Sequence, residues 1–140
     1  MGYSYEQELG FVSSDDKDGA IKFCLNQVLQ GRLFEQLLML LSDENGIEGF
    51  GGDPCWDLER RSPYVAENEG WPDWASFKAT ACEIYSLEHP ETFYRRDDFL
   101  SFIERALKVY LDRHPDRRDD CVGVFNELQR IYSSGRSARC

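Results

Sequence analysis

The stretch that decides the fold reads Asp97-Asp-Phe-Leu-Ser-Phe-Ile-Glu-Arg-Ala-Leu-Lys-Val-Tyr-Leu-Asp-Arg113 and is followed by His114-Pro115. Its apolar residues recur at intervals of three and four, which predicts an amphipathic helix over 97–113. The apolar stripe covers more than half of the circumference, so this helix needs neighbours on two sides. Asp97 suits the N-terminal cap, Arg113 suits the negative end of the dipole, and Pro115 favours an end at His114.

Two helices are predicted before this one. Residues Ile21, Cys24, Leu25 and Val28 follow helical spacing after Ser13-Ser14-Asp15-Asp16, which predicts a first helix from about Asp15 to Leu29. Gly31 is expected to adopt the left-handed conformation and to end that helix. Residues 33–41 are apolar on nearly every side, so they predict a second helix that is buried.

A fourth helix is predicted near the C-terminus and is expected to end before Gly135. Residues 1–14 are expected to form a partly ordered arm and residues 134–140 a frayed tail, which leaves one globular domain over 15–133. The apolar positions of the fourth helix are Cys121, Val124, Phe125, Leu128, Ile131 and Tyr132.

Residues 42–96 carry turn signals and short strand patterns. The glycines and proline of 42–57 predict a loop or a pair of tight turns. Strands are predicted at 63–67, 79–87 and 91–95, with the last two joined as an antiparallel hairpin, although a helical turn over 74–81 also fits the spacing. The fold class is therefore α+β: two N-terminal and two C-terminal helices packed with a small, mostly antiparallel sheet.

The charge of the chain is strongly negative and unevenly distributed. The sequence has 26 acidic and 16 basic residues and a net charge of −10. Residues 1–60 hold 12 acids and 4 bases, and 43–59 alone hold six acids and no base. This distribution argues against direct nucleic-acid binding, which needs clustered Lys and Arg, and favours a basic protein partner.

Several features predict a cytoplasmic protein. No apolar run approaches the ~20 residues of a membrane span, and the first residues lack the pattern of a signal peptide. The five cysteines are odd in number and widely spaced, which argues against both a disulfide framework and a zinc site. Cys24, Cys82 and Cys121 are expected in the core as small apolar residues.

No pattern typical of an enzyme is found. His89 and His114 each precede a proline at a turn, and neither has a nucleophile or an orienting partner nearby in the sequence. A calcium loop starting at Asp43 fails at Ile47 and Glu48, and the glycines of 46–52 lack the strand and helix of a dinucleotide site. We therefore expect no catalytic residue, cofactor or metal.

The segment from Asp43 to Trp74 is the best candidate for a functional surface. It interleaves nine acids with five aromatic residues and contains only two bases, Arg60 and Arg61. Acids steer a basic partner during encounter, and aromatic side chains supply anchors once it docks. The predicted partner-binding residues are Asp53, Asp57, Glu59, Glu67, Glu69, Trp71, Asp73 and Trp74.

Three groups of segments occur in a recognisable order. They read Ile21-Lys-Phe-Cys-Leu-Asn with Gly31-Arg-Leu-Phe-Glu, then Gly46-Ile-Glu-Gly-Phe-Gly-Gly with Cys55-Trp-Asp-Leu, and then Glu91-Thr-Phe-Tyr with Asp97-Asp-Phe-Leu and Ala106-Leu-Lys-Val-Tyr-Leu-Asp-Arg-His-Pro. Over residues 18–133 this order resembles the immunity proteins that neutralise ribonuclease toxins of bacterial contact-dependent growth inhibition systems. Trp71-Pro-Asp-Trp74 and the first dozen residues have no counterpart there, and no binding residue is carried over from the family.

The resemblance implies a protein that binds the cationic nuclease domain of its cognate toxin and inhibits it as a monomer in a 1:1 complex. The acidic residues would occupy the basic RNA-binding cleft of the toxin, and Trp71 or Trp74 would anchor the contact. Two alternatives remain open: an adaptor domain that binds a basic protein segment, and a metal-assisted hydrolase that uses clustered acids.

Overall fold

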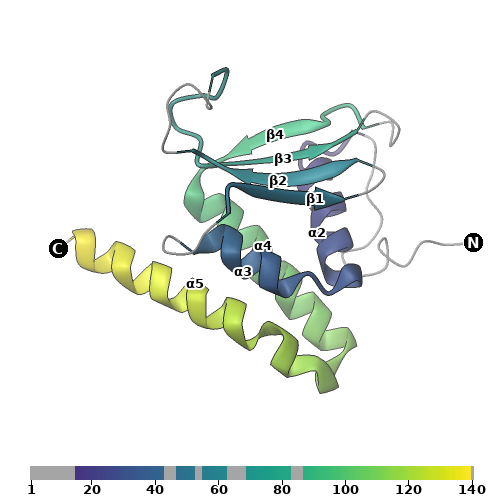
Figure 1. Cartoon of the computed structure of the whole chain (residues 1–140), viewed down its shortest axis with the longest axis vertical. Helices are drawn as coiled ribbons and strands as arrows, with labels where there is room; N and C mark the ends of the chain where they lie inside the picture. Colours follow the sequence, from purple (N-terminus) through teal and green to yellow (C-terminus); the bar gives the residue numbers. More distant parts are fainter. Residues whose placement is uncertain (1–14, 43–46, 53–54, 63–68, 83–86, 140) are drawn as a thin grey trace, which may run out of the picture.

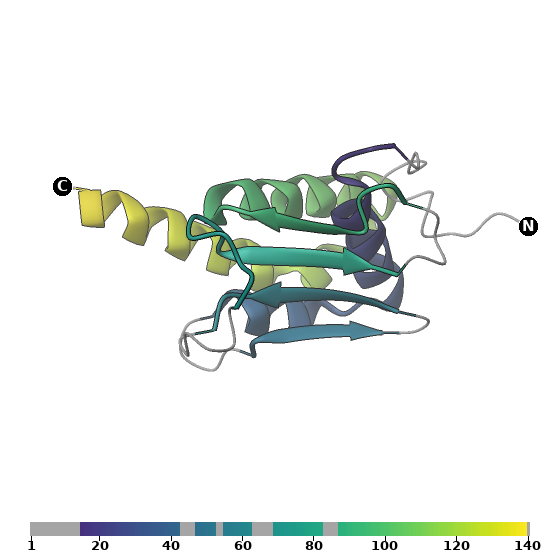
Figure 2. The same ribbon diagram turned by 90° about the horizontal axis from the view of Figure 1, so that it is seen from above.

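The fold is a four-stranded sheet covered on one face by four α-helices (Figures 1 and 2), as a computed structural model shows for residues 15–42, 47–52, 55–62, 69–82 and 87–139. The α+β class, with two helices before the sheet and two after it, is confirmed. The elements are α2 (Gly19–Gly31), α3 (Phe34–Leu41), β1 (Gly49–Gly52), β2 (Trp56–Arg60), β3 (Phe77–Ala81), β4 (Glu91–Tyr94), α4 (Arg96–Arg113), the 3-10 turn η3 (Pro115–Arg117) and α5 (Arg118–Arg139).

The sheet is an antiparallel meander in the order β1-β2-β3-β4. Side chains alternate between its two faces. The face toward the helices carries Trp56 and Leu58 of β2 and Phe77, Ala79 and Ala81 of β3, all of them buried. The opposite face has no helix over it in either ribbon view (Figures 1 and 2). We call this uncovered side of the sheet the open face.

Helix α4 lies at the centre of the core, as its wide apolar stripe predicts. Phe99 stacks on Phe77 with ring centroids 4.0 Å apart, and Tyr110 meets Phe34 edge-on at 5.2 Å. The N-terminal part of α4 therefore packs on the sheet, and its C-terminal part packs on α3. Helix α5 forms the far layer, packed on α3 and α4 (Figure 1).

The boundaries of the first two helices differ from the prediction in detail. Helix α2 begins at Gly19, four residues later than expected, because Asp16 binds the backbone N–H of Asp18 and the ammonium of Lys22 at the preceding turn. The left-handed residue after the helix is Arg32, with φ of 54°, and not Gly31. Helix α3 agrees with the prediction over 34–41.

One prediction for the middle of the chain is wrong, and one alternative is excluded. A loop or a pair of tight turns is predicted for 42–57, but β1 and the start of β2 form an antiparallel pair within it. The helical turn considered for 74–81 is excluded, because residues 77–81 form β3, whose burial alternates with the period of a strand. The strand predicted at 63–67 lies outside the described residues.

The C-terminal helix is longer than predicted, since α5 continues past Gly135 to Arg139. None of the helices in the described parts of the chain is both long and apolar enough to cross a bilayer.

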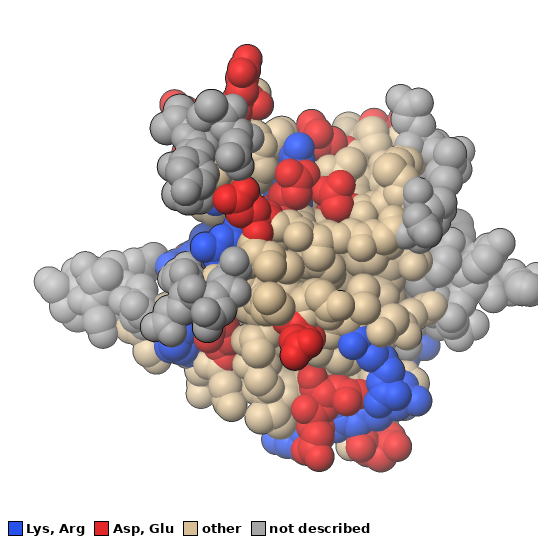
Figure 3. Space-filling model, in the orientation of Figure 1, with Lys and Arg blue, Asp and Glu red and all other residues tan. Residues whose placement is uncertain are grey.

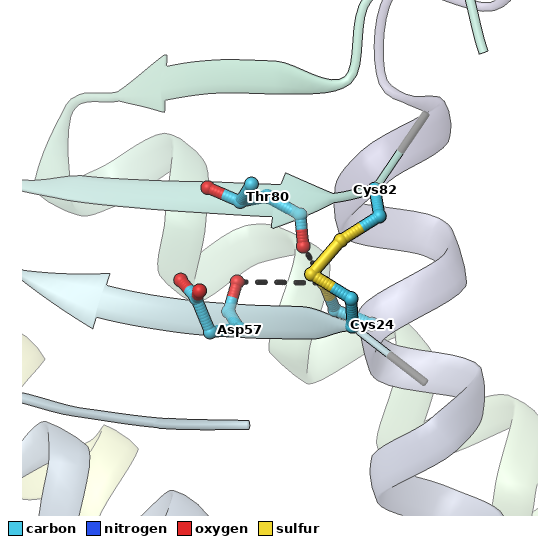
Figure 4. Close-up of a disulfide and its surroundings, with 5 residues drawn as sticks. Cys24, Asp57, Thr80 and Cys82 are labelled. Atoms are coloured by element: carbon cyan, nitrogen blue, oxygen red, sulfur yellow. Dashed lines mark hydrogen bonds between the residues drawn. A yellow bond between two sulfur atoms is a disulfide. The ribbon is translucent and has the colours of Figure 1, made fainter. Parts of the chain in front are cut away.

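The prediction for Cys82 is wrong, because it forms a disulfide with Cys55 (Figure 4). The two residues extend the β2–β3 ladder by one position beyond Trp56 and Ala81, and the Cys82 N–H donates to the Cys55 carbonyl at 3.0 Å. Their Cα atoms are 5.4 Å apart, a normal spacing for a disulfide. Cys24 and Cys121 are free and buried, as expected.

Candidate functional site: the open face of the sheet

The open face is built by strand residues that alternate with the core positions. Because Trp56 and Leu58 point to the helices, Asp57 and Glu59 point the other way. The strand register places Thr80 opposite Asp57 and Lys78 opposite Glu59 on the same face. The next strand adds Glu91 opposite Thr80 and Phe93 opposite Lys78. The open face is therefore defined by Asp57, Glu59, Lys78, Thr80, Glu91 and Phe93.

One ammonium group lies between carboxylates on this face. Lys78 Nζ is 3.5 Å from Glu59 Oε2 and 3.4 Å from Glu91 Oε2. The side chain of Lys78 is only 16% exposed, whereas those of Glu59 and Glu91 are 38% and 51% exposed. The cation is therefore enclosed and the carboxylates remain accessible. Figure 3 shows red carboxylates with a blue group among them on the upper part of the molecule, where Figure 1 places the sheet.

Asp57 is the most perturbed carboxyl group of the open face. Burial, followed by the hydrogen bond and the negative charge of Glu59, raises its pKa to about 6, and Lys78 opposes this rise with a smaller lowering. Its Oδ1 atom and the Thr80 Oγ1 atom on the opposed residue are both buried, and neither has a hydrogen-bond partner among the described residues. A charge held in such surroundings is poorly solvated and gains from a cationic partner.

The glycines of β1 leave this edge of the open face without side chains. Gly49 lies opposite Glu59 and Gly51 lies opposite Asp57. A Cβ atom at Gly51 would lie 2.0 Å from the Trp56 carbonyl oxygen, so only glycine fits there. The two carboxylates consequently have no neighbouring side chain from β1 above them.

Aromatic rings border the carboxylates on the β4 side. Trp71 meets Phe93 edge-on with centroids 5.4 Å apart, and Lys78 Nζ lies 5.6 Å from the Trp71 ring and 5.7 Å from the Phe93 ring. These contacts join Trp71 to the ion pairs through Lys78. The half-buried Trp71 is thus held beside the charges.

The structure brings together only part of the predicted site. Asp57, Glu59 and Trp71 share the open face, whereas Trp74 is 47% exposed and lies against Arg95, 5.1 Å from ring to guanidinium carbon. Glu69 and Asp73 are exposed in the connection between β2 and β3. Asp53 and Glu67 lie outside the described residues.

Lys78 and Glu91 were missed by the sequence analysis. The alternation in 77–81 and 91–94 could have placed each of them on the polar face of its strand. Nothing in the sequence, however, sets the register that puts both beside Glu59.

The disulfide closes the end of the open face at which β2 starts and β3 ends. Beneath it, on the core side, the Cys24 thiol of α2 approaches the Thr80 and Asp57 carbonyl oxygens at 3.3 and 3.6 Å (Figure 4). Burial raises the pKa of this thiol, with a smaller contribution from the charge of Asp57, so Cys24 is a neutral thiol. The disulfide and the two thiol contacts fix the strands that carry Asp57 and Thr80.

The two histidines lie outside the strands that form the open face. His89 is exposed before β4, and the His114 ring is tilted against Tyr110 with centroids 4.8 Å apart. Among the described residues no group of three or more His, Cys, Asp or Glu could hold a metal ion.

Comparisons with protein-family models, with curated proteins and with solved structures found no match. Function is therefore inferred from the chemistry of the open face.

Proposed function

We propose that the protein is an immunity protein that binds and inhibits a cognate ribonuclease toxin of a contact-dependent growth inhibition system. The observation that carries this proposal is the open face, where Glu59 and Glu91 enclose the ammonium group of Lys78 beside Trp71 and Phe93 and where Asp57 is hydrogen-bonded to Glu59. With Asp57, Glu59 and Glu91 ionised, these carboxylates and Lys78 sum to a net charge of −2, since three negative charges meet one positive charge.

The chemistry of this face complements a ribonuclease. A nuclease binds phosphate groups with clustered Lys and Arg, so its active cleft is positively charged. The carboxylates of the open face would take the place of phosphates, and the opposed fields would raise the association rate. Trp71 would add buried apolar area at the edge of the contact.

The proposed inhibition is stoichiometric, by a monomer in a 1:1 complex in the cytoplasm. Disulfides are uncommon in a reducing cytoplasm, so in that compartment Cys55 and Cys82 are expected as a pair of opposed thiols. The ladder hydrogen bond between their backbones would hold the strand ends in either state.

Neutralising the three carboxylates of the open face without changing their shape tests the proposal. The triple variant Asp57→Asn, Glu59→Gln, Glu91→Gln removes three charges, and the control Glu35→Gln, Asp112→Asn, Asp116→Asn removes three from exposed helical and turn positions. The proposed partner is the cationic nuclease domain of a toxin whose gene is expected directly upstream. We expect the triple variant to associate at least about tenfold more slowly at low salt, and the control to stay within about twofold of the parent.

Growth protection gives the functional readout. Cells that express the toxin domain should survive with the parent protein or the control and should be poorly protected by the triple variant. Equal affinity and equal protection by both variants would place the interface elsewhere. Binding to the nuclease without any loss of ribonuclease activity would instead favour an adaptor that recognises a basic segment.

A further inference from the structure

A cavity of about 260 Å³ lies at the end of the molecule where β2 ends and α4 begins. Three of its wall residues are arginines, Arg60, Arg61 and Arg96, in a chain whose net charge is −10. No acidic residue is found among the described residues of the wall. Figure 3 shows basic side chains on the left of the view, the side on which the arrow of β2 ends in Figure 1.

Backbone carbonyls hold two of the arginine heads in place. Arg60 Nη1 donates to the carbonyls of Leu40 at 3.1 Å and Ser42 at 2.7 Å, at the C-terminal end of α3. Arg61 Nη1 donates to the carbonyls of Pro72 and Ala75, both at 2.9 Å. Carbonyl partners fix the orientation of a guanidinium, so a ligand would not have to order these side chains.

The third arginine stands at the first turn of α4. The Arg96 side chain is 43% exposed and lies beside Asp97, with 3.2 Å between Arg96 Nη2 and Asp97 Oδ1. It can therefore turn toward a ligand in the cavity without leaving a buried site. The Ser76 hydroxyl lies on the same wall.

The remaining wall of the cavity is apolar. Phe77, 7% exposed, is stacked on Phe99, and Leu100 is fully buried. Leu41 and Ile131 complete this side. The cavity thus has charged hydrogen-bond donors on one side and apolar side chains on the other. An inorganic anion would bind the donors but would make no apolar contact.

We propose that this arginine cavity binds a small organic anion, namely a carboxylate attached to a compact apolar body. A planar carboxylate matches the paired N–H groups of a guanidinium, and the apolar body would displace water from Ile131 and from the exposed edge of Phe77. The volume equals that of roughly nine molecules of liquid water, which suits one ring with a short acidic arm. The site is separate from the open face, so this proposal does not depend on the proposed inhibition.

The test is a titration of the isotope-labelled full-length protein by NMR. The probes are phenylacetate, its neutral analogue phenylacetamide, and inorganic phosphate. We expect phenylacetate alone to saturate in the millimolar range, with amide shifts concentrated at Ser76, Phe77, Leu100 and Ile131. Arg96→Gln should weaken the binding about tenfold, whereas Arg105→Gln on the outward side of the same helix should leave it unchanged.

Each other result overturns the proposal or a stated part of it. If the shifts of the parent protein do not saturate at phenylacetate concentrations at which the protein is still folded, the site is excluded. Equal binding of phosphate removes the role of the apolar wall, and equal binding of phenylacetamide removes the role of the arginines. Equal losses in Arg96→Gln and Arg105→Gln would show a general charge effect.

Discussion

At the scale of single residues, the ionised Asp57 side chain lowers the free energy of unfolding. Its folded pKa of about 6 exceeds the ordinary value of 3.8, so the folded protein keeps the proton to higher pH than the unfolded chain. The free energy of unfolding therefore falls as pH rises from 3.8 through 6, and above that range the ionised carboxylate destabilises the fold. Such a residue is typical of a site whose charge serves binding.

Asp57→Asn should raise stability at neutral pH. The amide has the same shape, carries no charge and can donate to Glu59. We expect a gain of about 1 kcal/mol near pH 7.5, after allowance for solvent screening, which corresponds to a few degrees in Tm. Near pH 4 the gain should largely disappear, because Asp57 is then protonated in the folded state. Thermal unfolding at both pH values measures this gain in stability, with Asp112→Asn as the exposed control. An equal Tm for parent and variant near pH 7.5 would contradict the raised pKa of Asp57.

At the scale of elements, the sequence predicts helices better than strands here. The periodicity of 97–113 and of 34–41 identifies α4 and α3, because a helix is specified by residues close in the chain. Strand β1 is not predicted because Gly49, Gly51 and Gly52 signal turns locally, and only their close approach to β2 explains them. The disulfide was missed because its cysteines are 27 residues apart and meet only through the β2–β3 register.

Two glycine-to-alanine changes should have opposite effects. Gly51→Ala would place a methyl group 2.0 Å from a backbone oxygen that cannot move independently, so we expect a loss of about 2–3 kcal/mol and a disturbed β1–β2 pairing. Gly123→Ala on an exposed position of α5 meets nothing closer than 3.5 Å, so we expect a gain of up to about 1 kcal/mol.

Chemical denaturation of both variants measures these changes. If Gly51→Ala is as stable as the parent, β1 does not approach β2 as closely as described. If Gly123→Ala is less stable than the parent, α5 does not expose this position.

At the scale of the whole molecule, four arginines gather in a region distinct from the carboxylates of the open face. The open face carries the carboxylates of β2 and β4, while Arg60, Arg61, Arg95 and Arg96 gather where β2 and β4 end and α4 begins. The sequence indicated the acidic character and the aromatic residues of the candidate site. It could not indicate that Lys78 lies among the carboxylates, that Glu91 joins Asp57 and Glu59, or that Trp74 lies apart beside Arg95, since all three depend on tertiary pairing.

The central claim is that the open face is the surface that meets the basic partner. Hydrogen exchange of the protein, alone and bound to the proposed nuclease partner, tests this claim most directly. We predict that protection on binding concentrates in β2, β3 and β4 around Asp57, Lys78 and Glu91, with little change along α5. Protection confined to α5 and the outer side of α4, with the sheet unchanged, would contradict the account.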